Sequence, residues 1–432
     1  MRFPLLDGTH CDHCDHTAII PPSEVTPARM EKSHLAVTAL WMVAAAYAVF
    51  IGWTLVSGYR AATRGEMPLY TDYTPTYAAS ILVSEIPAEN LYRPKYMAEA
   101  GRRAAVAAYP GITPEQARGV GFAPWMYPPT FILLVAPLAA MPYLLSWFAW
   151  IGLTAVPYLA AMRRILPSAL AWPFALAAPP VFFNVMYGQT GFLTGGLIGL
   201  GLTLLAAHPL VAGILIGLAS VKPHFGILVP IALAAGGHWR TFAAASITVL
   251  STVAASAIAF GDDPWFAFIG TSLFHLEGFG AGAYNFIPMT TVLATLRMAG
   301  LPLHAAWDAQ YASATLMVAI VAWVWWRGRR RADTLGLQSA ILCTATPLAI
   351  PMTYLYDLVL LVPAAGWIWA DMMQRGAGRD EKLILLIAMA ALLAVKYVAA
   401  TFGLQTGALF TAALLFLALR RFRATIDARH PE

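Results

Sequence analysis

Long apolar segments alternate with short polar or basic segments along most of the chain. HLAVTALWMVAAAYAVFIGWTLV (34–56) and TFAAASITVLSTVAASAIAF (241–260) each reach the roughly 20 apolar residues that a helix needs to cross a bilayer. From residue 128 onward similar segments follow one another closely, and several are shorter than a full crossing. The pattern predicts an all-α polytopic membrane protein with about 11–13 transmembrane or re-entrant helices.

Apart from the longer gap at 261–282, the apolar segments after residue 128 are separated by short loops. They cover 129–141, 143–162, 168–186, 190–207, 209–236, 241–260, 283–300, 306–326, 335–351, 354–371, 382–402 and 404–419. The domain organisation that follows is simple. A polar N-terminal tail (1–33) and a short C-terminal tail (424–432) flank a transmembrane domain (34–423), which contains a first outer loop (58–127) and a second outer loop at 261–303.

Composition and charge agree with a membrane location. The chain is 59% hydrophobic and 11% charged, whereas a soluble domain carries about 25% charged residues. The net charge of +5 comes largely from RGRRR (327–331), QRGAGRDEK (374–382) and RRFR (420–423). Because basic loops stay in the cytoplasm, these clusters indicate membrane topology rather than nucleic-acid binding. Both tails are then cytoplasmic, and the first loop lies on the outer face.

Arg163 and Arg164 conflict with this topology. If 129–141 and 143–162 both cross the membrane, the two arginines lie outside, although the positive-inside rule places them in the cytoplasm. Either one segment is re-entrant, or the arginines face an active site.

The two outer loops contain further predicted features. Residues 75–85 and 95–108 read as short amphipathic helices. The second loop is rich in glycine and aromatic residues, so it could form a lid over a cleft. Possible substrate contacts in the second loop are His275, Glu277 and Asn285. Its Asp262 and Asp263 resemble a metal pair, although adjacent carboxylates at a helix start are commonly caps.

Cysteine and histidine are concentrated in HCDHCDH (10–16), which could hold a soft divalent metal. Against this, the tail is polar and distant from other ligands. We expect no obligatory metal and no cofactor. Cys343 lies in an apolar segment and is expected to be a small core residue.

Asp72 is the single carboxylate of YTDYTPTYAAS (70–80). A carboxylate near a lipid-lined cleft can act as a general base, and the tyrosines and threonines around it could form the wall of a sugar site. Equally, Asp72 could cap a helix that begins near Thr74.

Three later motifs place polar groups inside apolar segments. In VKPHFG (221–226), a lysine that is costly to bury precedes a helix-breaking proline. Lys222 therefore suits an anionic leaving group, unless it snorkels to the interface. In PMTYLYDLVLL (351–361), Asp357 could pair with Lys222, orient an acceptor or stabilise a helix N-terminus. NVMYGQTGFL (184–193) offers neutral hydrogen-bonding groups, or is a polar helix junction without a ligand.

The order and spacing of these motifs resemble glycosyltransferase family 87, also known as the DUF2029 domain. The resemblance spans residues 35–375 and rests on YTDYTPTYAA, ENLYRPKY (89–96), YPPTFILLVAPLAAMPYLLSWFAW (127–150), NVMYGQTGFL and AGILIGLASVKPHFGILV (212–229). The family includes polyprenol-phosphate-mannose-dependent α-mannosyltransferases.

The resemblance implies a GT-C fold, with an active site on the outer, periplasmic face of the cell inner membrane. Such an enzyme moves a hexose, expected to be mannose, from a polyprenyl-phosphate donor to a lipid-linked or cell-envelope acceptor with inversion, and its first-loop aspartate is the base. By position that aspartate is Asp72. The donor phosphate is assigned to Lys222 and His224. The expected substrate contacts are Tyr73, Tyr77, Asn184, Gln189, Tyr354, Tyr356 and Asp357.

Two observations leave alternatives open. Histidines occupy the late region in the mannosyltransferases of the family, where this chain has YLYD, so the resemblance supports the reaction class and leaves the sugar and the acceptor open. A transporter or flippase for a lipid-linked saccharide would also need a charged site among many helices. It would usually have paired repeats and no long loop, whereas this chain shows no convincing repeat and has the long first outer loop with its isolated aspartate. A non-catalytic member that binds lipid-linked sugar is the third alternative.

Overall fold

The computed structural model describes residues 27–64, 72–109, 111–113, 115–119 and 123–428. Regular structure in these residues is helical, with one isolated bridge between Met289 and Tyr354. The elements are α1 (Pro27–Thr63), α2 (Thr74–Glu85), η2 (Ala88–Tyr92), α3 (Pro94–Ala108), η3 (Gln116–Gly119), α4 (Pro129–Val135), η4 (Ala136–Ala140), α5 (Tyr143–Ile165), α6 (Ser168–Ala177), α7 (Pro179–Tyr187), α8 (Gly191–Leu204), α9 (Pro209–Leu218), η5 (Ala219–Val221), η6 (Pro223–Gly226), α10 (Val229–Gly236), α11 (Trp239–Phe260), α12 (Asp263–Gly280), α13 (Val292–Met298), α14 (Leu303–Gly328), η7 (Ala332–Thr334), α15 (Leu335–Ala349), η8 (Leu355–Leu360), α16 (Leu361–Arg375), α17 (Arg379–Ala390), η9 (Ala391–Leu393), α18 (Val395–Phe402) and α19 (Gly407–Asp427).

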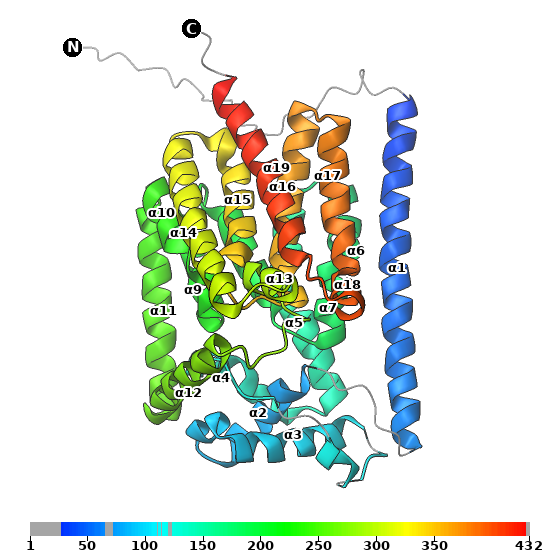
Figure 1. Ribbon diagram of the computed structural model, residues 1–432, viewed down its shortest axis with the longest axis vertical. Helices are drawn as coiled ribbons and strands as arrows, with labels where there is room; N and C mark the ends of the chain where they lie inside the picture. The colour runs from blue at the N-terminus through cyan, green and yellow to red at the C-terminus, as the bar shows by residue number, and fades with distance from the viewer. Residues whose placement is uncertain (1–26, 65–71, 110, 114, 120–122, 429–432) are drawn as a thin grey trace, which may run out of the picture.

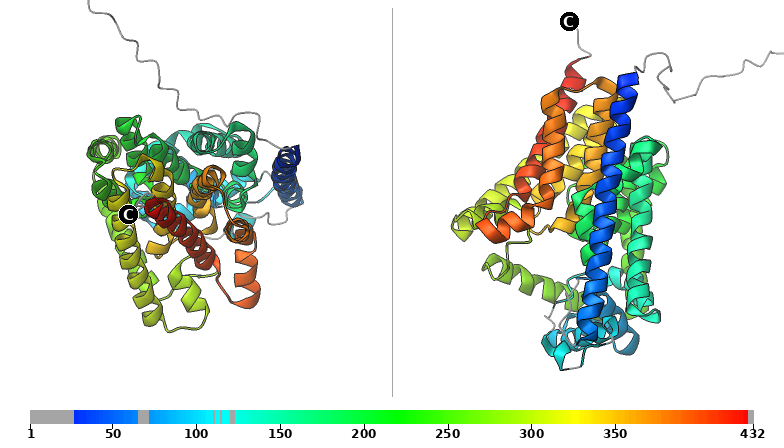
Figure 2. Two further views of the ribbon diagram at one scale, coloured as in Figure 1. Left: turned by 90° about the horizontal axis from the view of Figure 1, so that it is seen from above. Right: turned by 90° about the vertical axis from the view of Figure 1, so that its right-hand side faces the viewer.

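Length and composition identify the helices that can cross a membrane. Among the described residues five are long and apolar enough, and seven if the bent pairs α6–α7 and α17–α18 each count as one span. The apolar window of α1 has a mean hydropathy of 2.0 and none of it is buried. Figure 2 shows this helix at the edge of the bundle, along its full height. An apolar helix exposed on all sides needs a lipid environment, so the predicted all-α polytopic membrane fold is confirmed.

Arginines gather at one end of the bundle, which we call the basic end. It carries Arg163 and Arg164 on α5, Arg327 on α14, Arg375 on α16 and Arg421 on α19, and it is the upper end in Figure 1. Buried pairing joins several of these helices. Arg421 contacts Asp371 at 2.5 Å and Glu381 at 2.7 Å, so α16, α17 and α19 meet at the basic end.

Segment 209–236 is a re-entrant hairpin rather than one crossing. Before α9 begins, Thr203 near the end of α8 accepts a hydrogen bond from Arg164 at 3.2 Å, and after α10 ends, the His238 ring lies 5.7 Å from Trp325 near the end of α14. Both ends are therefore at the basic end. Pro209–Val221 is only about 20 Å long, against about 30 Å of hydrocarbon. The turn at Lys222 thus lies inside the membrane.

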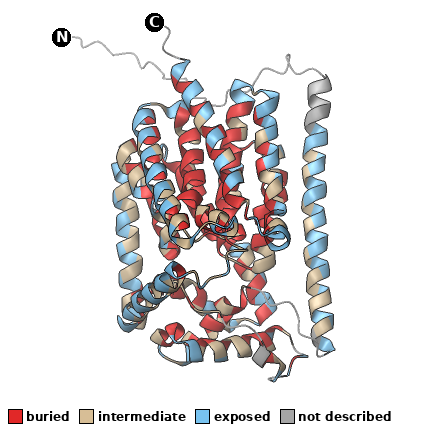
Figure 3. Cartoon of the chain, in the orientation of Figure 1, coloured by how far each residue is buried: buried red, intermediate tan, exposed pale blue. Residues whose placement is uncertain are grey.

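Two further hairpins share this course. The pair α6–α7 leaves the basic end, turns at Gly188 and Gln189, and returns as α8. Helix α15 leaves it, turns at residues 350–354, and returns as η8 and α16, where Arg375 donates to the Asp333 carbonyl beside the start of α15 at 2.9 Å. Their turns meet in the middle of the molecule, where Figure 3 shows the densest burial.

The conflict over Arg163 and Arg164 is resolved by α4 and η4. These two short helices pack against α2 at the end opposite the basic end, and Figure 1 shows α4 near α2 and α12 there. We call this the site end. Because α4 and η4 do not cross, α5 alone runs from the site end to the basic end, and its arginines join the other basic residues.

The outer segments cover the site end. Helices α2 and α3 match the predicted amphipathic helices within one residue at either end, and Arg103 of α3 holds Glu85 of α2 at 2.6 Å. The prediction for 283–300 is wrong in extent, since only Val292–Met298 is helical there. The residues before this segment form α12, which begins at Asp263 and Pro264. A glycine-rich turn ends the helix, with Gly282 at φ 75°.

Candidate functional site

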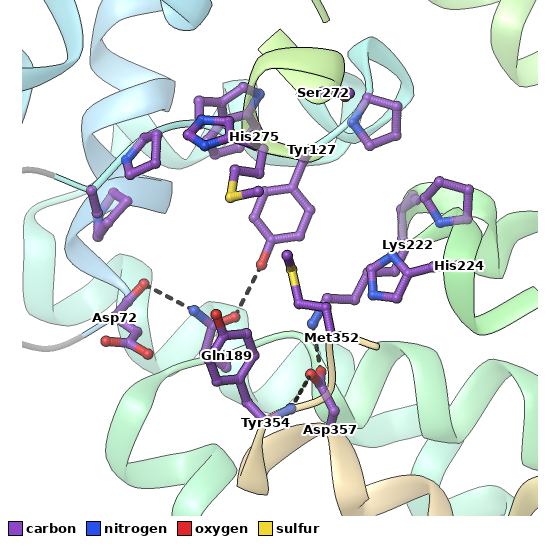
Figure 4. Close-up of a pocket in the computed structure, with 18 of the residues that line it drawn as sticks. Asp72, Tyr127, Gln189, Lys222, His224, Ser272, His275, Met352, Tyr354 and Asp357 are labelled. Atoms are coloured by element: carbon purple, nitrogen blue, oxygen red, sulfur yellow. Dashed lines mark hydrogen bonds and ion pairs between the residues drawn. The ribbon is translucent and has the colours of Figure 1, made fainter. Parts of the chain in front are cut away.

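A cavity of about 470 Å³ lies where the three hairpin turns face the outer segments. Gln189 and Lys222 come from two of the turns, and Asp357 comes from η8 directly after the third. Asp72 and Tyr127 come from the segments before α2 and α4. Helix α12 closes another side with Ser272 and His275. Figure 4 shows these side chains around one space. Residues separated by up to 285 positions in the chain therefore share one site.

Lys222 and Asp357 form a buried ion pair on the cavity wall. The Lys222 Nζ lies 2.5 Å from Asp357 Oδ1, and the two residues are 7% and 1% exposed. Nζ also lies 5.2 Å from the centre of the Tyr356 ring and 5.5 Å from that of Phe225. A single unpaired charge at this depth would be strongly disfavoured. The ion pair therefore compensates the cost of burying each of the two charges.

Asp357 also supports the third hairpin turn. Its Oδ2 accepts a hydrogen bond from the Tyr354 backbone N–H at 3.1 Å, at the start of η8. Two of the roles considered for Asp357, pairing with Lys222 and stabilising a helix start, are thus filled at once by its two oxygens. Lys222 is held in place by a carboxylate that is itself fixed to the backbone.

The carboxylate of Asp72 lies across the cavity from this pair. Helix α2 begins at Thr74, and its N-cap residue is Tyr73, without a side-chain cap, so Asp72 does not cap it. Burial raises the pKa of Asp72, while Lys396 and then Lys222 lower it, and Asp357 raises it. A half-buried carboxylate with a raised pKa is suited to accepting a proton.

Gln189 connects the first hairpin turn to the outer segments. Its Oε1 accepts from the Tyr127 hydroxyl at 3.0 Å, and its Nε2 donates to the Asp72 carbonyl at 3.4 Å. Gly188 permits this turn with φ 66°, and a Cβ there would lie 2.6 Å from that of Tyr73. Tyr127 is a site residue that the sequence analysis did not single out, because a proline in the first turn is typical of a helix start. YPP does begin α4 with a proline in its first turn, and its tyrosine also lines the cavity.

Three predicted contacts lie behind the cavity wall. Tyr73 is fully buried with its hydroxyl 2.6 Å from Ser146 Oγ, and Tyr77 donates to the Met141 carbonyl at 2.9 Å. Asn184 Oδ1 accepts from the Gly191 N–H at 2.8 Å. Their polar groups brace α2 against α5 and close the turn before α8, whereas Tyr354, Tyr356 and His224 line the cavity itself.

The predicted contacts of the second outer loop separate in the same way. His275 lines the cavity, and its Nδ1 is hydrogen bonded to the Tyr284 hydroxyl. Burial lowers the pKa of His275, so it is a neutral hydrogen-bonding group near pH 7. Glu277 and Asn285 are exposed and do not line the cavity.

The described residues contain no group of three histidine, cysteine, aspartate or glutamate side chains placed to hold a metal. The HCDHCDH segment lies outside the described residues. Cys343 is a buried free cysteine in the core, as its apolar surroundings in the sequence predict.

Fold and site together define an integral membrane protein that holds a charged and hydrogen-bonding cavity inside a helical bundle. The family model of glycosyltransferase family 87 matches residues 125–351, slightly more than half of the chain. The chain therefore belongs to glycosyltransferase family 87 and is a membrane glycosyltransferase. The match includes Tyr127, Gln189 and Lys222, while Asp72 and Asp357 lie outside it. No curated protein and no solved structure matched the chain.

Proposed function

We propose that the protein transfers a hexose, with mannose as the first candidate, from a polyprenyl-phosphate donor to a lipid-linked or envelope acceptor. The observation that carries the proposal is that Asp72 and Lys222 lie on different walls of one cavity. A displacement at a sugar carbon needs a base on the attacking side and a cation on the leaving side.

In the proposed reaction, Asp72 accepts the proton of an acceptor hydroxyl. The acceptor oxygen forms a bond to the anomeric carbon while the bond from that carbon to the phosphate oxygen breaks, which inverts the configuration. The released polyprenyl phosphate takes the bonding electrons. Lys222 donates to this phosphate through the N–H groups not used by Asp357. His224 lines the cavity beside Lys222.

Neutral groups would hold the sugar. Tyr127, Gln189, Tyr354 and Tyr356 surround the space between Asp72 and Lys222. Hydroxyl and amide groups suit sugar hydroxyls because they donate and accept without adding charge. Tyr73, Tyr77 and Asn184 are proposed to support these contacts from behind.

The basic end suggests the orientation. If its arginines lie in the cytoplasm, the cavity opens toward the periplasmic side of a bacterial inner membrane. Asp72 and the helices α2 and α3 then lie on the outer side.

The test is transfer from polyprenyl-phosphate-mannose to an envelope lipid extract by the purified protein, with products measured by mass spectrometry. Asp72→Asn is expected to lower the rate about 10²- to 10⁴-fold, the usual contribution of general base catalysis. Asp262→Asn is the matched control, since Asp262 is an exposed carboxylate at the site end. Full activity in Asp72→Asn would contradict the mechanism, and lipid translocation without product would favour a transporter.

A further inference from the structure

Lys396 is a second lysine beside the site, on the membrane-facing side. It follows the break between α17 and α18, where the chain bends by 61°. Its neighbours Leu393, Tyr397 and Phe402 are apolar and 45–66% exposed, which is typical of a surface in contact with lipid tails. It lies 17 residues beyond the start of α17, about 25 Å from the basic end and within the depth of the bilayer.

The side chain of Lys396 turns inward to α7. Its Nζ donates to the Tyr187 hydroxyl at 2.6 Å and lies 5.1 Å from the centre of the Tyr187 ring. A snorkelling lysine would extend along the helix to the interface. In the part of the chain that the structure describes, no carboxylate forms an ion pair with Lys396. Its charge acts on the Asp72 carboxylate, which lies beyond ion-pair distance, so the ammonium group can still accept another anion as a direct partner.

The position of Lys396 is continuous with the cavity. Tyr187 precedes the Gly188–Gln189 turn, and its ring lies 6.0 Å from the Tyr356 ring on the cavity wall. Among the charged groups that act on Asp72, Lys396 lowers its pKa the most. A cation without a direct ion-pair partner in the described residues, placed among lipid-facing residues next to a reaction cavity, is suited to an anion that arrives through the membrane.

We infer that Lys396 and the Tyr187 hydroxyl bind the phosphate of a second lipid at the membrane-facing edge of the cavity, distinct from the phosphate assigned to Lys222. This inference rests on the proposed function in that one lipid phosphate already occupies Lys222. A lipid-linked acceptor would carry such a group. Lys222 cannot serve both lipids, because Asp357 accepts from one of its N–H groups and the donor phosphate is assigned to the others.

Native mass spectrometry in an uncharged detergent tests the inference by counting bound farnesyl phosphate, with farnesol as the uncharged reference. Wild type is expected to bind two phosphate-dependent molecules, and Lys396→Met one. Lys396→Arg keeps the charge and is expected to restore the second. Lys382→Met is the matched control, because Lys382 is an exposed lysine on the same helix pair at the basic end. Phosphatidylglycerol is added in a separate arm: displacement of the second molecule identifies a phospholipid headgroup as the source, and its absence identifies an isoprenyl phosphate.

The outcomes separate this inference from the proposed function. If wild type binds one molecule and Lys396→Met none, the Lys396 site stands and the phosphate role of Lys222 fails. If Lys396→Met binds as many molecules as wild type, or wild type shows no preference for phosphate over farnesol, the inference is overturned. Should Lys396→Met not fold, Tyr187→Phe keeps the ring and is expected to weaken the second binding event several-fold. Unchanged affinity in that variant overturns the inference as well.

Discussion

Lys222 and Lys396 both lie inside apolar segments, at breaks between two helices. They differ in exposure and in the partner of the ammonium group. Lys222 is 7% exposed and paired with Asp357 at 2.5 Å. Lys396 is exposed, and in the described residues it donates to the neutral Tyr187 hydroxyl instead of forming an ion pair. The first charge is balanced inside the protein, so it is a structural requirement as well as a candidate reagent. The second remains available to a ligand from the membrane.

Removing each lysine should affect stability very differently. Lys222→Met leaves Asp357 buried without its partner, which is expected to cost about 3–5 kcal/mol. Lys396→Met leaves no buried carboxylate unpaired and is expected to change stability by no more than about 0.5 kcal/mol. Thermal unfolding in detergent, followed by tryptophan fluorescence, measures both.

A double variant separates charge from shape. Lys222→Met with Asp357→Asn removes both charges and keeps an oxygen for the Tyr354 N–H. It should recover most of the lost stability while transfer activity stays low. If Lys396→Met unfolds as early as Lys222→Met, the contrast between the two lysines is wrong.

The pH dependence of transfer should respond to Lys396. Asp72 must be ionised to act as base, and its pKa is raised by burial and lowered by Lys396 and Lys222. Activity is therefore lost as pH falls through this raised pKa. Because Lys396 favours the ionised form, Lys396→Met raises the pKa further and moves the acid limb of kcat/KM to higher pH. Lys382→Met should leave the limb unchanged, and an unmoved limb in Lys396→Met would show that the two groups do not interact.

Salt should give the smallest effect. Because Lys396 lies among lipid-facing residues rather than in water, raising KCl from about 50 to about 500 mM is expected to weaken phosphate binding there by less than about twofold. The Lys222–Asp357 pair is shielded from solvent, and the unfolding temperature should shift by the same amount in wild type and in the double variant. A larger salt shift in wild type would mean that the pair is open to water.

Much of the helix content could be predicted because it depends on local composition. Apolar length predicted α1, α5, α11 and α14, and the expectation of two short amphipathic helices predicted α2 and α3 within one residue. The 283–300 prediction failed because apolar residues there pack as an irregular segment, with Met289 bridged to Tyr354. The hairpin within 209–236 was missed because two half-length apolar helices and one crossing share the same composition.

The site was predicted in its charged residues and less well in its neutral ones. Asp72, Lys222 and Asp357 are conspicuous because charge is rare in this chain, and all three line the cavity. Tyr73, Tyr77 and Asn184 stand in the same motifs but face the opposite way, toward Ser146, Met141 and Gly191. Neighbouring residues in a helix or turn point in different directions, and a motif does not say which of them reaches the cavity.

By itself the sequence determined the membrane class, the helical architecture, the basic end and the family, because hydropathy, charge and motif order are properties of the chain. Only the tertiary structure decided which segments turn back inside the membrane, and therefore that Gln189, Lys222 and Asp357 meet Asp72. It also decided that Lys222 has a carboxylate partner and Lys396 has none among the described residues. The physical reason is that pairing and burial depend on contacts between distant segments, such as the 135 positions between Lys222 and Asp357.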